Sequence, residues 1–121
     1  MYHAGANYAA SFLLCALYEA ATLWEAAGID RDAAVAAMWP LVDGTLAAAR
    51  ARGLAGALAG PVSRGDGGVI DKHLQALDAL GADHATLYTA LTRRALALAT
   101  ERGAPSADVL ADLAKRLDRA Q

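Results

Sequence analysis

Residues 2–28, YHAGANYAASFLLCALYEAATLWEAAG, decide the fold class of this chain. Alanine, leucine and other good helix formers fill the stretch, and its last residue is a glycine, the usual signal for a helix C-terminus. At helical spacing, one arc of about 100° collects six polar side chains. They are His3, Asn7, Ser11, Tyr18, Thr22 and Glu25. Most of the remaining surface is apolar, so the stretch predicts a long helix buried on several sides.

The rest of the chain continues this helical pattern. Four further helices are expected, over residues 30–52, 69–80 and 83–102 and from Pro105 onward. Asp30 is placed to cap the second helix, and Pro40 inside that helix predicts a kink or break near residues 38–39. No alternating strand pattern and no internal repeat is present. The sequence therefore predicts an all-α bundle of about five helices, folded as one domain over residues 1–121.

Apolar residues at helical spacing mark the faces expected to point into the core. In the third helix these are Ile70, Leu74 and Leu77; in the fourth they are Leu87, Leu91 and Leu98; in the fifth they are Val109, Leu110, Leu113 and Leu117. The fifth helix has acidic residues early and basic residues late, which suits the helix dipole. Within it, Asp112 and Arg116 lie four residues apart, so we expect an ion pair between them.

Composition and charge restrict the function. The chain is 56% hydrophobic and 20% charged, and its net charge of −2 without a basic block argues against nucleic acid as a partner. The single cysteine, Cys15, excludes an internal disulfide and is expected to be an unreactive core thiol in a reducing compartment. Apolar runs are too short to span a membrane and no signal peptide is visible, so a cytoplasmic protein is expected. The three histidines are too scattered to suggest a metal site.

A glycine-rich loop interrupts the helices within residues 59–74, AGPVSRGDGGVIDKHL. Its glycines allow positive φ angles and close approach of the backbone to another group. The loop leads into a helix N-terminus near Val69, where free N–H groups can bind phosphate or carboxylate. Arg64 either binds an anion or pairs with Asp66, and a simple helix connection with a surface ion pair is the alternative. The loop is not a P-loop, because no Lys-Ser/Thr follows its glycines.

Several segments together resemble a known family. They are YHAGANYAASFLLCALYEAATLWEAAGI, PLVDGTL, LAGPVSRGD, KHLQAL and LYTALTRRALALA. Over residues 2–100 the chain resembles the domain of unknown function 2520, and G-P-x-x-R-G-D is the densest motif. Known members carry this helical domain after a Rossmann-like NADP-binding domain. The resemblance implies a fold like the C-terminal domain of 6-phosphogluconate dehydrogenase, similar to the helical parts of ketopantoate reductase, pyrroline-carboxylate reductase and the hydroxyacid dehydrogenases.

The resemblance also implies a site and a cofactor. In ketopantoate reductases and hydroxyacid dehydrogenases, the first helix of this domain presents a Lys and an Asn one turn apart to the substrate. The matching positions here hold His3 and Asn7, which are the expected catalytic residues. The expected substrate-binding residues are Ser11, Arg64, Asp66 and His73. The implied cofactor is NADP, bound mainly by a dinucleotide-binding domain whose G-x-G-x-x-G motif and parallel sheet this sequence lacks.

Two functions of different classes fit these observations. The first is the substrate-binding and dimerisation domain of an NAD(P)-dependent oxidoreductase, which forms a homodimer, accepts a small anionic substrate and reduces nothing by itself. The second is a non-catalytic helical module that dimerises or binds another protein. The first function predicts that His3, Asn7 and Arg64 converge on one pocket. The second predicts that they scatter and that apolar side chains form the contact.

Overall fold

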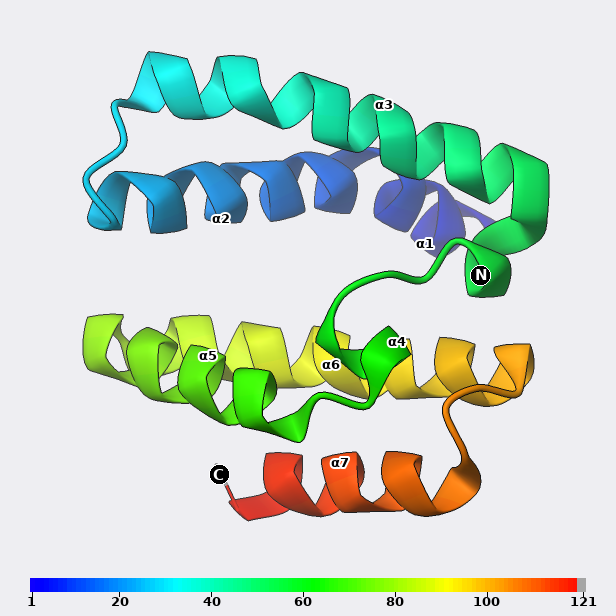
Figure 1. Cartoon of the computed structure of the whole chain (residues 1–121). Helices are drawn as coiled ribbons and strands as arrows, with labels where there is room; N and C mark the ends of the chain where they lie inside the picture. Colours follow the sequence, from blue (N-terminus) through cyan, green and yellow to red (C-terminus); the bar gives the residue numbers. More distant parts are fainter. Residues whose placement is uncertain (120–121) are drawn as a thin grey trace. The chain divides into compact units, whose positions relative to one another are not determined.

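The structure, a computed structural model, describes residues 1–119, and every regular element among them is a helix (Figure 1). This confirms the expected all-α fold. In chain order the elements are α1 (Tyr2–Asn7), the π-helix η1 (Tyr8–Phe12), α2 (Leu13–Ala26), α3 (Arg31–Gly56), α4 (Pro61–Arg64), α5 (Gly67–Leu80), α6 (Ala82–Arg102) and α7 (Ala107–Arg119). The chain divides into two compact units, Met1–Ala47 and Ala48–Gln121, here called the N-terminal and C-terminal units. A single domain over the whole chain stays a prediction.

In the N-terminal unit the end of α2 packs against the beginning of α3. Asp30 caps α3 as expected, because its Oδ2 accepts a hydrogen bond from the Ala33 N–H at 3.2 Å. Arg31 then reaches back to α2, where it pairs with Glu25 and lies 4.9 Å from the centre of the Tyr18 ring. The buried residues of this unit are Ala21, Ala34 and Met38. The unit therefore has a small core, confined to one end of the helix pair.

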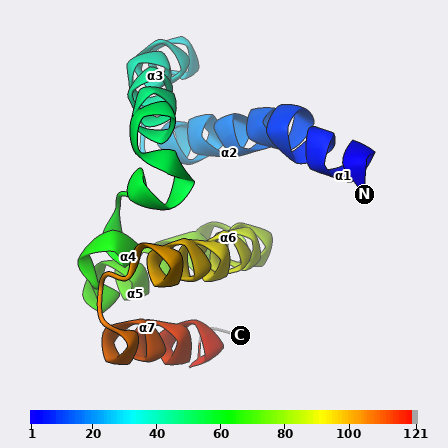
Figure 2. The ribbon, with the colours of Figure 1, turned by 90° about the vertical axis from the view of Figure 1, so that its right-hand side faces the viewer.

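The first helix is much less buried than its sequence predicts. Figure 2 shows α1 and η1 extending away from the beginning of α3. As a result, α3 covers only the C-terminal end of α2. No residue before Ala21 is buried. The expectation that Cys15 is a core thiol is therefore wrong, since this side chain is exposed. An apolar helix surface without a covering element is the main feature of this unit.

The expected break at Pro40 is not found. The backbone of α3 keeps helical angles on both sides of Pro40, and only Gly53 departs from them, with φ 76° and ψ 171°. Proline removes one hydrogen bond, to the carbonyl one turn earlier, and the residue there is the small Ala36. The helix accommodates that loss, whereas the glycine at position 53 adopts a positive φ that other residues avoid.

The main core lies in the C-terminal unit, where α5, α6 and α7 pack together (Figures 1 and 2). The cluster consists of Val62, Ile70, Leu74, Ala99, Leu110, Leu113 and Leu117. The core faces predicted for the third and fifth helices are thus confirmed, although Val109 is only half-buried. Complete burial of a leucine or isoleucine contributes roughly 1.5–3 kcal/mol. These side chains therefore supply most of the apolar stabilisation of the unit.

The core face predicted for α6 is wrong in part. Leu87 and Leu91 are exposed, and the residues of α6 that are buried are Ala85, Thr89, Thr92 and Ala99. Small side chains allow α6 to approach its neighbours closely. Thr92 can be buried because its hydroxyl donates a 2.7 Å hydrogen bond to the Tyr88 carbonyl of the preceding turn. The leucines are therefore turned outward.

Candidate functional site

The polar stripe of the first helix is interrupted by a π-helix. Residues 8–12 form η1, directly after Asn7. A π-turn contains about one residue more than an α-turn, so the helix beyond it is rotated by roughly 100° relative to the helix before it. The polar residues expected in one arc therefore divide into two groups, with His3 and Asn7 before η1 and Tyr18 to Glu25 beyond it. Hydrophobic periodicity assumes a constant turn and cannot detect this insertion.

The two groups differ in what they contact. Beyond η1, Tyr18 and Glu25 both contact Arg31, and the Thr22 hydroxyl donates to the Tyr18 carbonyl at 3.0 Å. These residues join α2 to α3. Before and within η1, by contrast, no side-chain hydrogen bond engages Asn7 or Ser11 in the part of the chain that the structure describes. The group before η1, His3 and Asn7, is thus the one available to a ligand.

His3 and Asn7 keep the arrangement expected of them. Both lie on α1, four residues apart, so that their side chains project from the same face of the helix. Both are exposed, and the His3 ring makes an edge contact with Tyr2 at 5.7 Å between ring centres. Imidazole and carboxamide groups at this spacing can donate a proton and a hydrogen bond to one substrate atom or to adjacent atoms.

The glycine-rich loop is organised as a cap for α5. Gly60 has φ 84° and precedes the short helix α4, and Gly65 follows α4 with the left-handed φ of 68°. Asp66 then caps α5 through a 3.1 Å hydrogen bond from the Val69 N–H to its Oδ1. Asp66 therefore does not pair with Arg64, which is exposed and makes no ion pair among residues 1–119. The Arg64 side chain is thus available to an anion.

The glycines of this loop also allow α7 to lie close to it. A Cβ atom added at Gly65 would lie 2.7 Å from Cγ1 of Val109, and one at Gly67 would lie 2.4 Å from Nε of Arg116. Real Cβ atoms do not approach other atoms so closely. The composition of the loop is thus explained by packing against α7 as well as by its turns.

Arg102, at the end of α6, fixes the loop in place. Its guanidinium donates to the carbonyls of Leu58 at 3.1 Å, Ser63 at 3.0 Å and Ala104 at 3.0 Å. One cation thus holds three backbone acceptors, which come from the segment before α4, from α4 itself and from the α6–α7 connection. The sequence gives no sign of this role, because two of the acceptors lie 44 and 39 residues away.

His73 forms a pair with Tyr88 across α5 and α6. Nδ1 of His73 lies 2.9 Å from the Tyr88 hydroxyl, and the two rings meet edge to face at 5.7 Å. Burial raises the pKa of the Tyr88 phenol above its ordinary value, against a smaller lowering by Thr92. The phenol therefore keeps its proton at neutral pH. His73 has a structural partner, and its substrate-binding role stays a prediction.

The raised pKa of Tyr88 has a measurable effect. A Tyr88→Phe variant is expected to lose the most alkaline part of the tyrosinate titration, followed by near-ultraviolet absorbance. In the folded state the phenol keeps its proton at pH values above the unfolded pKa of about 10. The contribution of this group to the free energy of unfolding is therefore complete below that pH and falls as the pH rises further. A titration curve whose alkaline end is the same in the variant as in the wild type would contradict the assignment.

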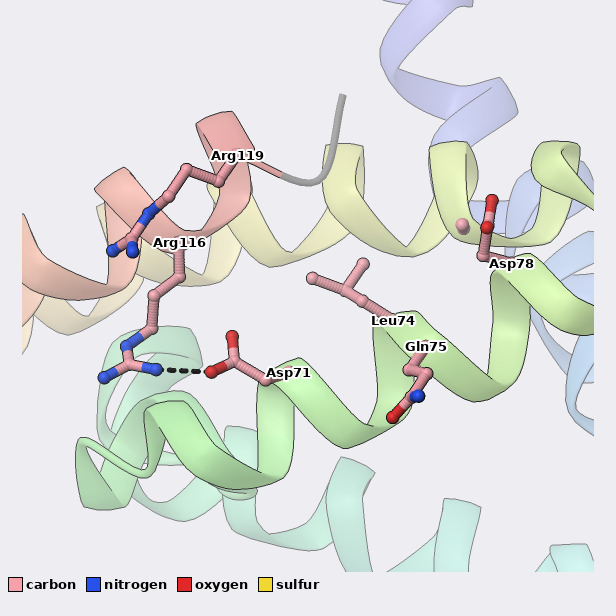
Figure 3. A pocket seen from close by; sticks show the side chains of 7 residues that line it. Asp71, Leu74, Gln75, Asp78, Arg116 and Arg119 are labelled. Carbon is pink, nitrogen blue, oxygen red and sulfur yellow. Dashed lines mark hydrogen bonds and ion pairs between the residues drawn. The ribbon is translucent and has the colours of Figure 1, made fainter.

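A groove of about 310 Å³ lies between α5 and α7 (Figure 3). It is lined by Asp71, Leu74, Gln75, Asp78, Ala85, Arg116 and Arg119. Arg116 is engaged there by two carboxylates, that of Asp71 and that of Asp112 at 2.8 Å. The second contact confirms the predicted ion pair of α7, and it lowers the pKa of Asp112. The Asp71–Arg116 pair joins α5 to α7 at this groove, and none of the predicted site residues lines it.

The predicted site residues thus belong to two sets. His3, Asn7 and Ser11 lie on the N-terminal unit, whereas Arg64, Asp66 and His73 lie on the C-terminal unit. Their convergence on one pocket stays a prediction. Over residues 1–119 the structure contains no group of three or more His, Cys, Asp or Glu side chains arranged to hold a metal ion. Over the same residues, no helix combines the length and the apolar character needed to cross a membrane.

Comparison with known proteins identifies the family. No curated protein and no solved structure matches the chain. The sequence model of one family, described as a domain of unknown function (DUF2520), matches residues 1–95. The match includes the first helix, the glycine-rich loop and most of α6, whereas Arg102 and α7 lie beyond it. Since the match covers more than half of the sequence, the chain belongs to the DUF2520 family.

Proposed function

We propose that this chain is the substrate-binding and dimerisation domain of an NAD(P)-dependent oxidoreductase and that it is not catalytic alone. The observation that carries the proposal is the exposure of polar side chains on the first helix. It presents His3, Asn7 and Ser11 on an exposed surface, and no side-chain hydrogen bond engages Asn7 or Ser11 among the described residues. π-helices occur often at functional sites, and one begins directly after Asn7.

The chemistry of these side chains suits carbonyl or imine reduction. In this proposal NADP, held by a dinucleotide-binding domain, supplies the hydride. His3 donates a proton or polarises the reacting group, and Asn7 orients it by hydrogen bonds. Arg64, whose guanidinium has no ion-pair partner among residues 1–119, is the candidate of the C-terminal unit for binding an anionic group. His3 stands where the similar reductases have lysine.

A non-catalytic interaction module is the second candidate. The observation that favours it is the exposed apolar surface of the same helix, which includes Tyr2, Tyr8 and Phe12. Exposed apolar patches of this kind mark contact sites for other proteins. The two candidates differ in whether His3 and Asn7 affect turnover.

Turnover by the native gene product, purified from its own cells after its intact mass has been measured, tests the proposal. NADPH oxidation is followed with a panel of small ketones and imines, with and without a carboxylate. We expect His3→Ala and Asn7→Ala each to lower kcat/KM by about 100-fold, the usual size for a lost proton donor or orienting donor. Thr45→Ala, on α3, is the control and should leave kcat/KM unchanged. Absence of NADPH oxidation, or full activity of both variants, would reject the enzyme role.

A further inference from the structure

We infer that the exposed surface of α1, η1 and the first turn of α2 packs against the same surface of a second copy of this chain. The surface consists of the large exposed apolar side chains of residues 1–14: Met1, Tyr2, Tyr8, Phe12, Leu13 and Leu14. The inference rests on the dimerisation part of the proposed function. It adds which surface makes the contact and what covers it.

The charge of this surface fits a second copy. No Asp, Glu, Lys or Arg occurs before Glu19 in the sequence. In a contact with two-fold symmetry, residues near the axis meet their own copies, so like charges there would repel. A partner of opposite charge would have no matching groups to bind in this segment. An uncharged surface is complementary to itself.

The apolar area is close to what a stable dimer needs. Tyr2, Tyr8 and Phe12 are 85%, 70% and 45% exposed. Since an aromatic side chain buries about 150–250 Å², these three offer roughly 400 Å² in each copy. Leu13 and Leu14 extend the surface toward the roughly 800 Å² per partner that a stable interface buries. The Tyr8 and Phe12 rings already contact each other edge to face at 4.8 Å, which makes them a preformed centre for the contact.

The C-terminal unit exposes too little apolar surface to be the matching partner. Within residues 1–119, eleven large hydrophobic side chains are exposed in the N-terminal unit and four in the C-terminal unit. The four are Leu54, Leu80, Leu87 and Leu91. Two N-terminal units therefore offer each other equal numbers of exposed large hydrophobic side chains, whereas an N-terminal and a C-terminal unit do not.

Small residues permit close approach of the paired helices. Alanine or glycine occupies positions 4, 5, 6, 9 and 10, between the large side chains of this helix, and a Cβ at Gly5 would meet nothing within 4 Å.

Sedimentation equilibrium at increasing protein concentration measures the dimer Kd and so tests the pairing. The wild type is expected to approach the mass of two chains as its concentration rises. Phe12→Lys and, independently, Leu14→Lys place like charges in the contact and should each raise the dimer Kd by about 30-fold. Leu91→Lys makes the same change at an exposed leucine of α6 and should leave the Kd unchanged. Far-ultraviolet circular dichroism establishes that each variant keeps its helices.

Each result either supports or overturns the pairing. It is overturned if the wild type keeps the mass of one chain at every concentration, or if Leu91→Lys raises the Kd while Phe12→Lys and Leu14→Lys do not. The assay involves neither cofactor nor substrate. If no dimer forms but turnover depends on His3 and Asn7, only the pairing is removed. If the dimer forms but turnover does not depend on them, only the enzyme role is removed.

Discussion

Gly65→Ala is expected to lower the free energy of unfolding by about 3 kcal/mol, as measured by denaturant unfolding. Gly65 has φ 68°, and a left-handed angle costs an L-residue roughly 1–2 kcal/mol. The added methyl group would also lie 2.7 Å from Cγ1 of Val109, and overpacking of this kind costs about 1–3 kcal/mol. Both effects act on the loop that connects α4 to α5.

Gly103 provides a matched control for the backbone part of this effect. Its φ is 80°, but a Cβ there would meet nothing within 4 Å. Gly103→Ala should therefore cost only about 1 kcal/mol. In a Val109→Ala background, Gly65→Ala should cost a similarly small amount, because the contacting methyl group is absent. Equal losses for Gly65→Ala with and without Val109 would show that α7 does not pack on the loop as described.

Arg102→Ala is expected to destabilise the chain by about 3 kcal/mol. The substitution removes the donors of three backbone carbonyls, those of Leu58, Ser63 and Ala104. A hydrogen bond with a charged donor contributes about 1.5–3 kcal/mol, and partial hydration of the freed carbonyls recovers part of the sum. Arg102→Lys should recover little of the loss, because an ammonium group cannot span acceptors arranged for a planar fork.

Arg94→Ala is the control for this prediction. Arg94 lies on the same helix, is exposed and makes no ion pair within residues 1–119. Its removal should change the free energy of unfolding by less than about 0.5 kcal/mol. Equal unfolding midpoints for the Arg102 and Arg94 variants would contradict the role given to Arg102. Amide hydrogen exchange of residues 58–66 should rise in the Arg102 variant alone.

The helices could be predicted from local sequence where periodicity and end signals agree. Asp30 and Gly28 fix the start of α3 and the end of the preceding helix, and Leu110, Leu113 and Leu117 mark the buried face of α7. These features depend on residues within a few positions of one another. The same rules also apply to Asp66, whose position three residues before Val69 is a capping pattern.

Features that depend on distant residues could not be predicted in this way. The buried face of α6 is set by the close approach of its neighbours, so Thr89 and Thr92 are inside while Leu87 and Leu91 are outside. The hydrogen bonds of Arg102 join segments that are distant in sequence, and so does the close approach of the Arg116 side chain to Gly67. The π-helix is a local feature, but the amino-acid composition of the helix does not indicate it.

The spacing of His3 and Asn7 could be predicted from the sequence, but their surroundings could not. The spacing of His3 and Asn7 follows from a regular helix, and the structure keeps it because η1 begins only after Asn7. The exposure of their helix was not predictable, since an apolar sequence indicates burial without saying which element provides it. In this chain no element of the N-terminal unit covers residues 1–14. That difference between sequence and structure is the basis for the proposed self-association.

The central claim is that the exposed apolar surface of the first helix joins two copies of the chain. Sedimentation equilibrium of residues 1–121 at increasing protein concentration tests it most directly. The account predicts that the mass rises from 12.4 kDa toward twice that value, and that Phe12→Lys shifts the rise to higher concentration. A mass that stays at 12.4 kDa throughout the concentration range would contradict it.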